Sequence, residues 1–360
     1  MEESQTSPIP CWMRKARLAL VAIATAALGM QESSAQNLKI GIIGLDTSHA
    51  EQFTMRLNDP AHPNHVPGGR IVAAYASYSK DLEESASRVE GFTATVRDKY
   101  GVAILDSIEA VCAEVDAIML LSLDGRPHIE QIKPILAAGK RVFVDKPVAA
   151  SLKEAIEIYK MADQVNVPIF SASSLRWYPG VVEVAAAAAT PPDAVLSYGP
   201  APILPFHPDL FFYGIHATEA LFTVMGEGCQ SVTRTSTPAS SVVVGVWRDG
   251  RSGTLHAMHQ LPQGSTDYKV IRFDGDLVTA QKSQGDYTPM LREIIQFFQT
   301  STPPVSAQQT LEIYGFMEAA EESKRRNGIP IKLRDIMQKA GAPEKWLPAQ
   351  EAPKVPAKGD

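Results

Sequence analysis

Cysteine is scarce in this sequence, and its scarcity excludes a disulfide framework. The 360 residues include three cysteines, of which Cys112 and Cys229 are far apart and lie in or beside apolar stretches. Small secreted domains that depend on disulfides carry many cysteines at close spacings. We therefore expect Cys112 and Cys229 to be buried free thiols.

An excess of positive charge is also missing. The 34 Lys and Arg residues against 40 Asp and Glu give a formal net charge of -6. Because nucleic-acid binding requires clustered Lys and Arg opposite the phosphates, no nucleic-acid partner is expected. The sequence has no internal repeat, phosphate-binding loop, Ser-His-Asp motif or zinc-ligand spacing, so no metal site is predicted.

Long apolar runs are absent, but a short one lies near the amino terminus. A basic cluster at residues 14–17 precedes an apolar run at 18–29, and small residues follow at 33–35. This order is typical of a secretory signal, and the run is too short to span a bilayer. We predict a cleaved signal peptide at residues 1–35, export to the periplasm or the extracellular space, and no membrane span after cleavage. An uncleaved anchor or a disordered tail is the alternative.

Short apolar runs alternate with helical patterns in the first half of the chain. The expected strands cover residues 38–44, 71–75, 117–121 and 141–144, and the expected helices cover residues 48–57, 108–114, 127–138 and 152–165. Strands that alternate with helices pair in parallel. The pattern predicts a Rossmann-like, doubly wound parallel sheet in a domain over residues 36–150.

A β-rich pattern replaces this alternation after Pro168. The expected strands cover residues 231–237, 241–247, 254–259, 270–274 and 276–280, and the expected helices cover residues 288–300 and 310–326. Successive strands joined by tight turns pair antiparallel. We predict an α+β domain with a largely antiparallel sheet over residues 151–345. The Pro-, Ala- and Lys-rich tail at 346–360 is expected to be disordered.

Three segments resemble motifs of the glucose–fructose oxidoreductase, inositol dehydrogenase and rhizopine-catabolism (Gfo/Idh/MocA) family. The segment AGKRVFVDKP at 138–147 resembles the signature A-G-K-x-V-x-x-E-K-P, with Asp145 in place of the usual Glu. YGIHATE at 213–219 resembles D-x-G-x-H-x-x-D, and His128 matches the family's helix-opening His. The resemblance covers roughly residues 38–333. It implies an oxidoreductase that uses tightly bound NAD or NADP on a sugar, polyol or glycoside, and that forms homo-oligomers.

Lys146 and His216 are the catalytic residues that the resemblance implies. Lys146 follows a buried strand, at the sheet edge where open α/β folds bind ligands, and its amine can hold developing alkoxide charge. His216 can exchange the hydroxyl proton near neutral pH. The family's Asp four residues before this His is replaced by Phe212. His207, Asp209 and Tyr213 are candidates to substitute for it.

The nucleotide-binding loop departs from the family's G-x-G-x-x-G fingerprint. Gly44 keeps the tight turn, whereas Asp46 and His49 replace the second and third glycines. A carboxylate at Asp46 is expected to repel the pyrophosphate, unless residues 46–48 only cap the next helix. The loop at 76–80 lacks a ribose-binding acid, which suits a 2′-phosphate or no dinucleotide at all.

The remaining site residues are carried over from the resemblance. Those expected to bind the cofactor are Gly44, Leu45, Asp46, Thr47, Ser48, His49, Ser122, His128 and Asp145. Those expected to contact the substrate are Arg176, Asp209, Tyr213 and Glu219. Two other functions stay open: a redox-neutral NAD-dependent glycosidase or lyase, and a non-catalytic carbohydrate-binding protein that has lost its cofactor.

Overall fold

A computed structural model describes residues 37–261, 267–275, 277–283 and 285–349. The signal peptide expected at residues 1–35 lies outside these ranges. Within them, no helix combines the length and apolarity that a bilayer crossing requires. The same described ranges contain no group of three or more His, Cys, Asp and Glu side chains placed to hold a metal ion.

The first sheet has six parallel strands in the order β3-β2-β1-β4-β5-β6. Its strands are β1 (Leu38–Ile43), β2 (Gly69–Tyr75), β3 (Ala103–Ile104), β4 (Ala117–Leu120), β5 (Arg141–Val144) and β6 (Ile169–Phe170). Every residue of β4 is buried, because helices cover both faces of a parallel sheet and leave little polar surface. The predicted Rossmann-like fold is confirmed. The sheet runs past residue 150, where the sequence analysis divides the chain, because the helix after β5 leads to a sixth strand.

The helices around this sheet come from two parts of the chain. Those before β6 are α2 (Ser48–Asn58), α3 (Glu83–Ala86), α4 (Val89–Ala94), η2 (Thr95–Lys99), α5 (Ile108–Glu114), α6 (His128–Ala137) and α7 (Leu152–Gln164). A later helix, α10 (Thr288–Thr300), also packs here, because its Leu291 and Ile294 belong to the apolar cluster of Ile40 and Ile42. The second half of the chain therefore contributes to the first core.

The second sheet has seven strands in the order β12-β11-β7-β10-β9-β8-β13. They are β7 (Ala194–Pro200), β8 (Cys229–Ser236), β9 (Ser240–Trp247), β10 (Ser252–Met258), β11 (Tyr268–Asp274), β12 (Leu277–Ser283) and β13 (Ile331–Lys332). Only β7 and β10 pair in parallel among these described strands, so the prediction of a largely antiparallel sheet is confirmed.

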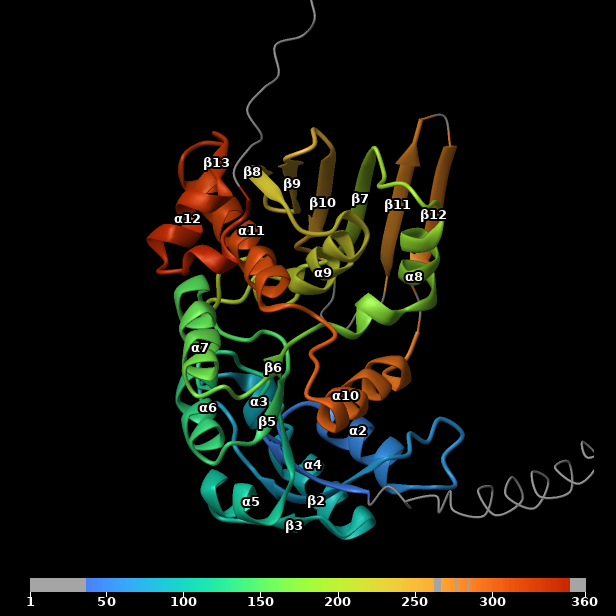
Figure 1. The fold of residues 1–360 in the computed structure, drawn as a ribbon, viewed down its shortest axis with the longest axis vertical. Helices are drawn as coiled ribbons and strands as arrows, with labels where there is room; N and C mark the ends of the chain where they lie inside the picture. Colours follow the sequence, from blue (N-terminus) through green and yellow to red (C-terminus); the bar gives the residue numbers. More distant parts are fainter. Residues whose placement is uncertain (1–36, 262–266, 276, 284, 350–360) are drawn as a thin grey trace, which may run out of the picture. The chain divides into compact units, whose positions relative to one another are not determined.

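Helices α9 (Gly214–Met225) and α11 (Ala307–Arg325) lie on one face of the second sheet (Figure 1). The smaller helical elements are η3 (Ser174–Trp177), α8 (Pro179–Ala186), α12 (Leu333–Lys339) and η4 (Glu344–Trp346). The disorder expected from residue 346 does not begin there. Trp346 and Leu347 are buried, and the Trp346 ring packs edge-on against Tyr159 of α7 with 6.2 Å between ring centres. Residues 350–360 lie outside the described ranges.

Candidate active site

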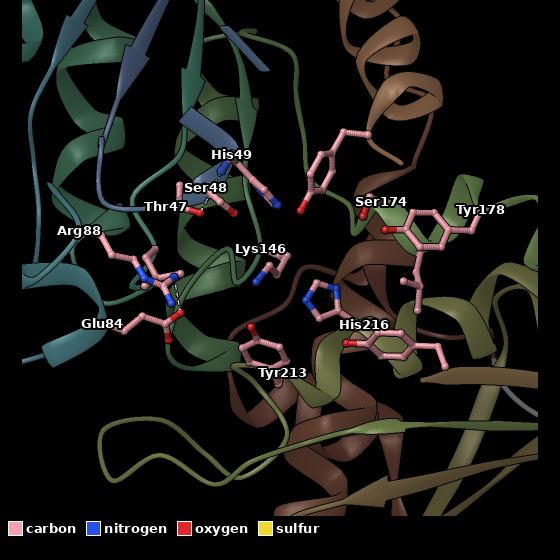
Figure 2. Close-up of a pocket in the computed structure, with 14 residues that line it drawn as sticks. Thr47, Ser48, His49, Glu84, Arg88, Lys146, Ser174, Tyr178, Tyr213 and His216 are labelled. Carbon is pink, nitrogen blue, oxygen red and sulfur yellow. Dashed lines mark hydrogen bonds and ion pairs between the residues drawn. The ribbon is translucent and has the colours of Figure 1, made fainter. Parts of the chain in front are cut away.

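A pocket of about 150 Å³ lies at the carboxyl edge of the first sheet (Figure 2). Parallel strands bring the segments that follow them to the same edge, so the loops after β1, β4 and β5 meet there. Residues of the second half of the chain complete the walls. The pocket is lined by Thr47, Ser48, His49, Glu84, Arg88, Leu123, Lys146, Ser174, Leu175, Tyr178, Tyr213, His216, Tyr268 and Tyr287.

Lys146 follows β5 and is 8% exposed. Its Nζ lies 5.4 Å from the ring centre of Tyr213 and 5.8 Å from that of Phe212, and aromatic faces stabilise a cation. Burial lowers the pKa of Lys146, although the neighbouring Asp145 carboxylate opposes this shift. A lysine of lowered pKa gives up a proton more readily, which suits a group that serves a reacting oxygen.

His216 lies in the first turn of α9 and reaches the same pocket. Its Nδ1 is 2.7 Å from Ser173 Oγ, so this hydroxyl fixes the orientation of the ring. Burial and the charges of Lys146 and His49 hold the pKa of His216 well below its usual value. His216 is therefore a neutral imidazole near pH 7. Phe212, which stands in place of the family's Asp, is 1% exposed and packs in a small apolar cluster.

His49 and Asp145 both depart from the family motifs, and they contact each other. His49 Nδ1 lies 2.5 Å from Asp145 Oδ2. Burial alone would raise the pKa of Asp145. The neighbouring His49 and Lys146 lower this pKa by more than burial raises it, so the carboxyl is ionised. His49 lines the pocket, whereas Asp145 is 3% exposed and lies behind it.

Asp46 does not present its carboxylate to the pocket, which corrects the expected repulsion of pyrophosphate. The residue is 0% exposed, and its carboxylate accepts hydrogen bonds from Leu123 N at 3.1 Å and from Ser85 Oγ at 2.6 Å. Burial raises its pKa to about 6. Thr47 caps α2 by accepting from His49 N, so the capping alternative holds for Thr47.

Four predicted cofactor residues lie beneath the pocket rather than in its wall. Leu45 is 0% exposed, and Gly44 is packed against the backbone of Ser122. Ser122 Oγ donates to Gln131 Oε1 at 3.0 Å. The ring of His128 is buried and lies 3.0 Å from both Ser122 O and Val148 O, so it joins the loop after β4 to the Lys146 turn.

Only Tyr213 of the four predicted substrate residues lines the pocket. Arg176 Nε donates to Glu219 Oε1 at 2.6 Å, and both side chains are largely buried. Asp209 accepts from Arg234 Nη2 at 2.6 Å and from Lys324 Nζ at 2.5 Å. Arg176, Glu219 and Asp209 therefore form ion pairs among residues that follow β6.

His207, the other candidate to replace the family's Asp, is placed near Asp124. Its Nε2 lies 3.2 Å from Asp124 Oδ1. Burial would raise the pKa of Asp124, but the neighbouring His207 and the hydrogen bonds from Arg126 outweigh it and lower that pKa. His207 does not line the pocket.

Most tyrosines of the pocket wall carry no signal in the sequence and were not predicted. Tyr178, Tyr268 and Tyr287 reach the pocket from segments that no motif marks, and burial raises the pKa of Tyr287 to about 12. These hydroxyls therefore stay protonated at neutral pH and can donate hydrogen bonds to a polar ligand. Glu84 of α3 pairs with Arg88 at 2.5 Å, and neither residue belongs to a motif of the sequence analysis.

Residues 38–173 match the model of a family described as "Oxidoreductase family, NAD-binding Rossmann fold". The inositol 2-dehydrogenase of Paracoccus denitrificans is 31% identical over 153 residues, which are 42% of this chain and 41% of that protein. An inositol 2-dehydrogenase of Cereibacter sphaeroides is 30% identical over 144 residues, which are 39% of this chain and 37% of that protein. The alignments thus span about two fifths of each curated relative.

Solved structures resemble the chain over a greater length. A probable dehydrogenase from Thermotoga maritima has a TM-score of 0.65 at 18% identity, covering 83% of this chain and 100% of that one. The scyllo-inositol dehydrogenase of Lactobacillus casei, solved with NAD(H) and scyllo-inositol, has a TM-score of 0.64 at 13% identity, covering 83% of this chain and 99% of that one. At these identities the likeness establishes the fold.

Proposed function

We propose that the protein belongs to the Gfo/Idh/MocA family, because residues 38–173 match the model of an oxidoreductase family with an NAD-binding Rossmann fold, and that it is an NAD(P)-dependent oxidoreductase acting on a hydroxyl group of a sugar, polyol or glycoside. The observation that carries the proposal is the shared pocket of Lys146 and His216. These residues come from opposite halves of the chain, and both belong to motifs of the family.

The residues at the start of α2 are compatible with a dinucleotide. Ser48 is exposed in the first turn of this helix, where backbone amides and the helix dipole favour a phosphate. Arg88 also lines the wall, where it pairs with Glu84, and the carboxylate of Asp46 is hydrogen-bonded away from the pocket. Thr47, Ser48 and Arg88 would hold the cofactor, whose nicotinamide supplies hydride transfer when bound.

The chain's own contribution is to bind and orient the reacting hydroxyl. The amine of Lys146 would donate a hydrogen bond to the substrate oxygen and stabilise negative charge that develops on it. His216, held by Ser173 at 2.7 Å, would contact the same hydroxyl through its other nitrogen. The tyrosines of the wall would bind further hydroxyl groups and exclude water.

The proposal is tested with purified protein and defined substrates. We expect NAD(H) or NADP(H) to be released on denaturation or to bind when added. We also expect myo-inositol, scyllo-inositol or a simple sugar to reduce the bound cofactor. Lys146→Met should abolish this reduction, whereas Lys153→Met, at an exposed lysine of α7, should not. Absence of binding by either dinucleotide would contradict the proposal and favour a carbohydrate-binding protein.

A redox-neutral glycosidase or lyase remains the second candidate, because a cofactor that stays bound can be reduced and reoxidised in one cycle. Glycoside breakdown with a transient keto sugar and no net NADH would favour it.

We also propose that the protein is exported. The basic cluster at 14–17 and the apolar run at 18–29 support this. Amino-terminal sequencing of protein from the native cell envelope should give a first residue near Gln36, and an intact Met1 or Met13 would contradict cleavage.

A homo-oligomer is proposed from the second sheet. Val242 and Val246 of β9 are 38% and 43% exposed, although α9 and α11 bury the other face of the sheet. An exposed β-branched face of this kind suits association with a second copy.

A further inference from the structure

His49 and Asp145 form a buried pair that the proposed chemistry does not use. His49 replaces a fingerprint glycine and Asp145 replaces the signature glutamate, so two separate departures from the motifs meet at one contact of 2.5 Å. Asp145 also accepts from Lys146 N at 2.8 Å through its other oxygen. The pair therefore joins the first turn of α2 to the residue beside the pocket lysine.

The His49 ring is held on several sides. Its ring stacks on Phe53 with 4.9 Å between centres and meets the edge of Tyr287 at 4.7 Å, while Thr47 Oγ1 accepts from its backbone amide. Figure 2 shows this ring pointing into the same space as Lys146 and His216. A side chain fixed in this way is preorganised for one geometry.

The carboxylate decides which ring nitrogen carries the proton. An ionised carboxyl only accepts hydrogen bonds, so the Nδ1 of His49 must be the protonated nitrogen. When the ring is neutral, Nε2 keeps its lone pair, and the imidazolium that forms on protonation is stabilised by Asp145. His216 has no such partner, because its Nδ1 faces the Ser173 hydroxyl and the cation of Lys146 disfavours its protonation.

We propose that His49 is the proton acceptor of this pocket and that Asp145 is the positioning residue that fixes its tautomer, with His216 serving to orient the substrate. The inference rests on the proposed function, since it assigns the base for the same hydroxyl. The O–H bond of the substrate breaks, its electron pair stays on oxygen beside Lys146, and the proton is held on His49 Nε2 until it leaves to water. Restoring Nε2 to its unprotonated form completes the cycle.

The first test needs no substrate. Long-range proton–nitrogen NMR of protein labelled with ¹⁵N-histidine reports which ring nitrogen is protonated, and the signals absent from His49→Gln identify His49. In the neutral ring we expect a protonated Nδ1 and a bare Nε2. Asp145→Asn should abolish this preference, and His62→Asn, in a loop away from the pocket, should leave it intact. A protonated Nε2 overturns the inference, whether or not a substrate is known.

The second test uses whichever of myo-inositol, scyllo-inositol or simple sugars is turned over. Asp145→Asn should lower kcat/KM by roughly 10²- to 10⁴-fold, change its pH profile and leave the melting temperature within a few degrees. Free imidazole should restore part of the activity of His49→Gly, because the missing side chain leaves space for an imidazole molecule. Unchanged rates and pH profiles in Asp145→Asn would overturn the inference while leaving the proposed function intact.

Absence of any turnover would instead contradict the proposed function, and the NMR result would still decide the tautomer.

Discussion

Asp46 is the residue at which burial and charge conflict most directly. Its carboxyl is 0% exposed, and burial raises its pKa from 3.8 to about 6. The two hydrogen bonds that it accepts tie the loop after β1 to the loops that carry Leu123 and Ser85. Asp46 therefore links these loops under the pocket. When its carboxyl is ionised, the buried charge lowers the free energy of unfolding.

This cost predicts a pH dependence of stability. Between about pH 4 and pH 6 the folded protein holds a proton on Asp46 that the unfolded chain releases, so stability from this group falls as pH rises. The full difference is about 3 kcal/mol at neutral pH. Relative to Asp46→Asn, the wild-type free energy of unfolding should thus decrease by about this amount from pH 4 to pH 7, measured by urea titration at each pH. Asp106→Asn, at an exposed carboxyl, should track the wild type, and a pH-independent difference for Asp46→Asn would contradict the reasoning.

At the scale of elements, the turn from β1 to α2 is fixed by Gly44. Its φ is +93°, and a Cβ there would lie 2.3 Å from Ser122 N and 2.5 Å from Ser122 Cα, which belong to the loop after β4. Gly139 also has a positive φ, of +64°, but nothing lies within 4 Å of its Cβ position. A substitution at Gly139 therefore tests backbone strain alone, whereas one at Gly44 tests backbone strain together with the close approach of two loops.

Gly139→Ala should cost about 1 kcal/mol of unfolding free energy through backbone strain alone. Gly44→Ala should cost several kcal/mol or prevent folding, because backbone atoms must also move apart. Thermal and urea unfolding of both variants measures the difference. Equal losses would mean that the contact between these two loops yields easily.

Helix α11 supports the Lys146 turn from the second half of the chain. Val148 N donates to the Tyr314 hydroxyl at 2.5 Å, and both residues are buried. Tyr314→Phe keeps the ring beside Phe211, 5.4 Å away, but leaves the Val148 amide without its acceptor. We expect a loss of about 1–3 kcal/mol in unfolding free energy, with kcat reduced more than KM is changed. Unaltered stability and kcat would show that water replaces the hydroxyl.

Local patterns predicted most elements, because hydrophobic periodicity and turn residues are properties of short segments. The expected helix at 288–300 coincides with α10, and the hairpin at 270–280 corresponds to β11 and β12. Strand β7 was not predicted, and its strand partners, β10 and β11, are distant in sequence.

The candidate site divides in the same way. Lys146 and His216 stand in contiguous motifs and could be found from the sequence. The contact between His49 and Asp145 joins residues 96 positions apart, and Tyr268 and Tyr287 of the pocket wall come from segments with no motif. Those contacts depend on tertiary packing, which short sequence patterns do not report. For the same reason the sequence predicted that the Asp46 carboxylate faces the cofactor, whereas the structure buries it.

For the whole molecule, the outer face of the second sheet is the surface with the clearest consequence. Residues of β9 alternate between buried and more exposed positions, so Val242 and Val246 project on the same side, away from α9 and α11. Their strand neighbours include His256, which pairs in register with Val242. A two-fold association would bury the same patch on both copies.

Val246→Glu should therefore convert a dimer or larger oligomer to monomer, because association would bury a carboxylate in an apolar contact without a partner. Analytical ultracentrifugation across a range of protein concentrations measures the change. Val182→Glu is the matched control, since Val182 is 46% exposed on α8 and lies outside this face. The pocket is formed within one chain, so the Val246→Glu monomer should keep its cofactor affinity even if its stability falls. A wild-type protein that sediments as a monomer at all concentrations, or an oligomer that survives Val246→Glu, would show that this face does not mediate association.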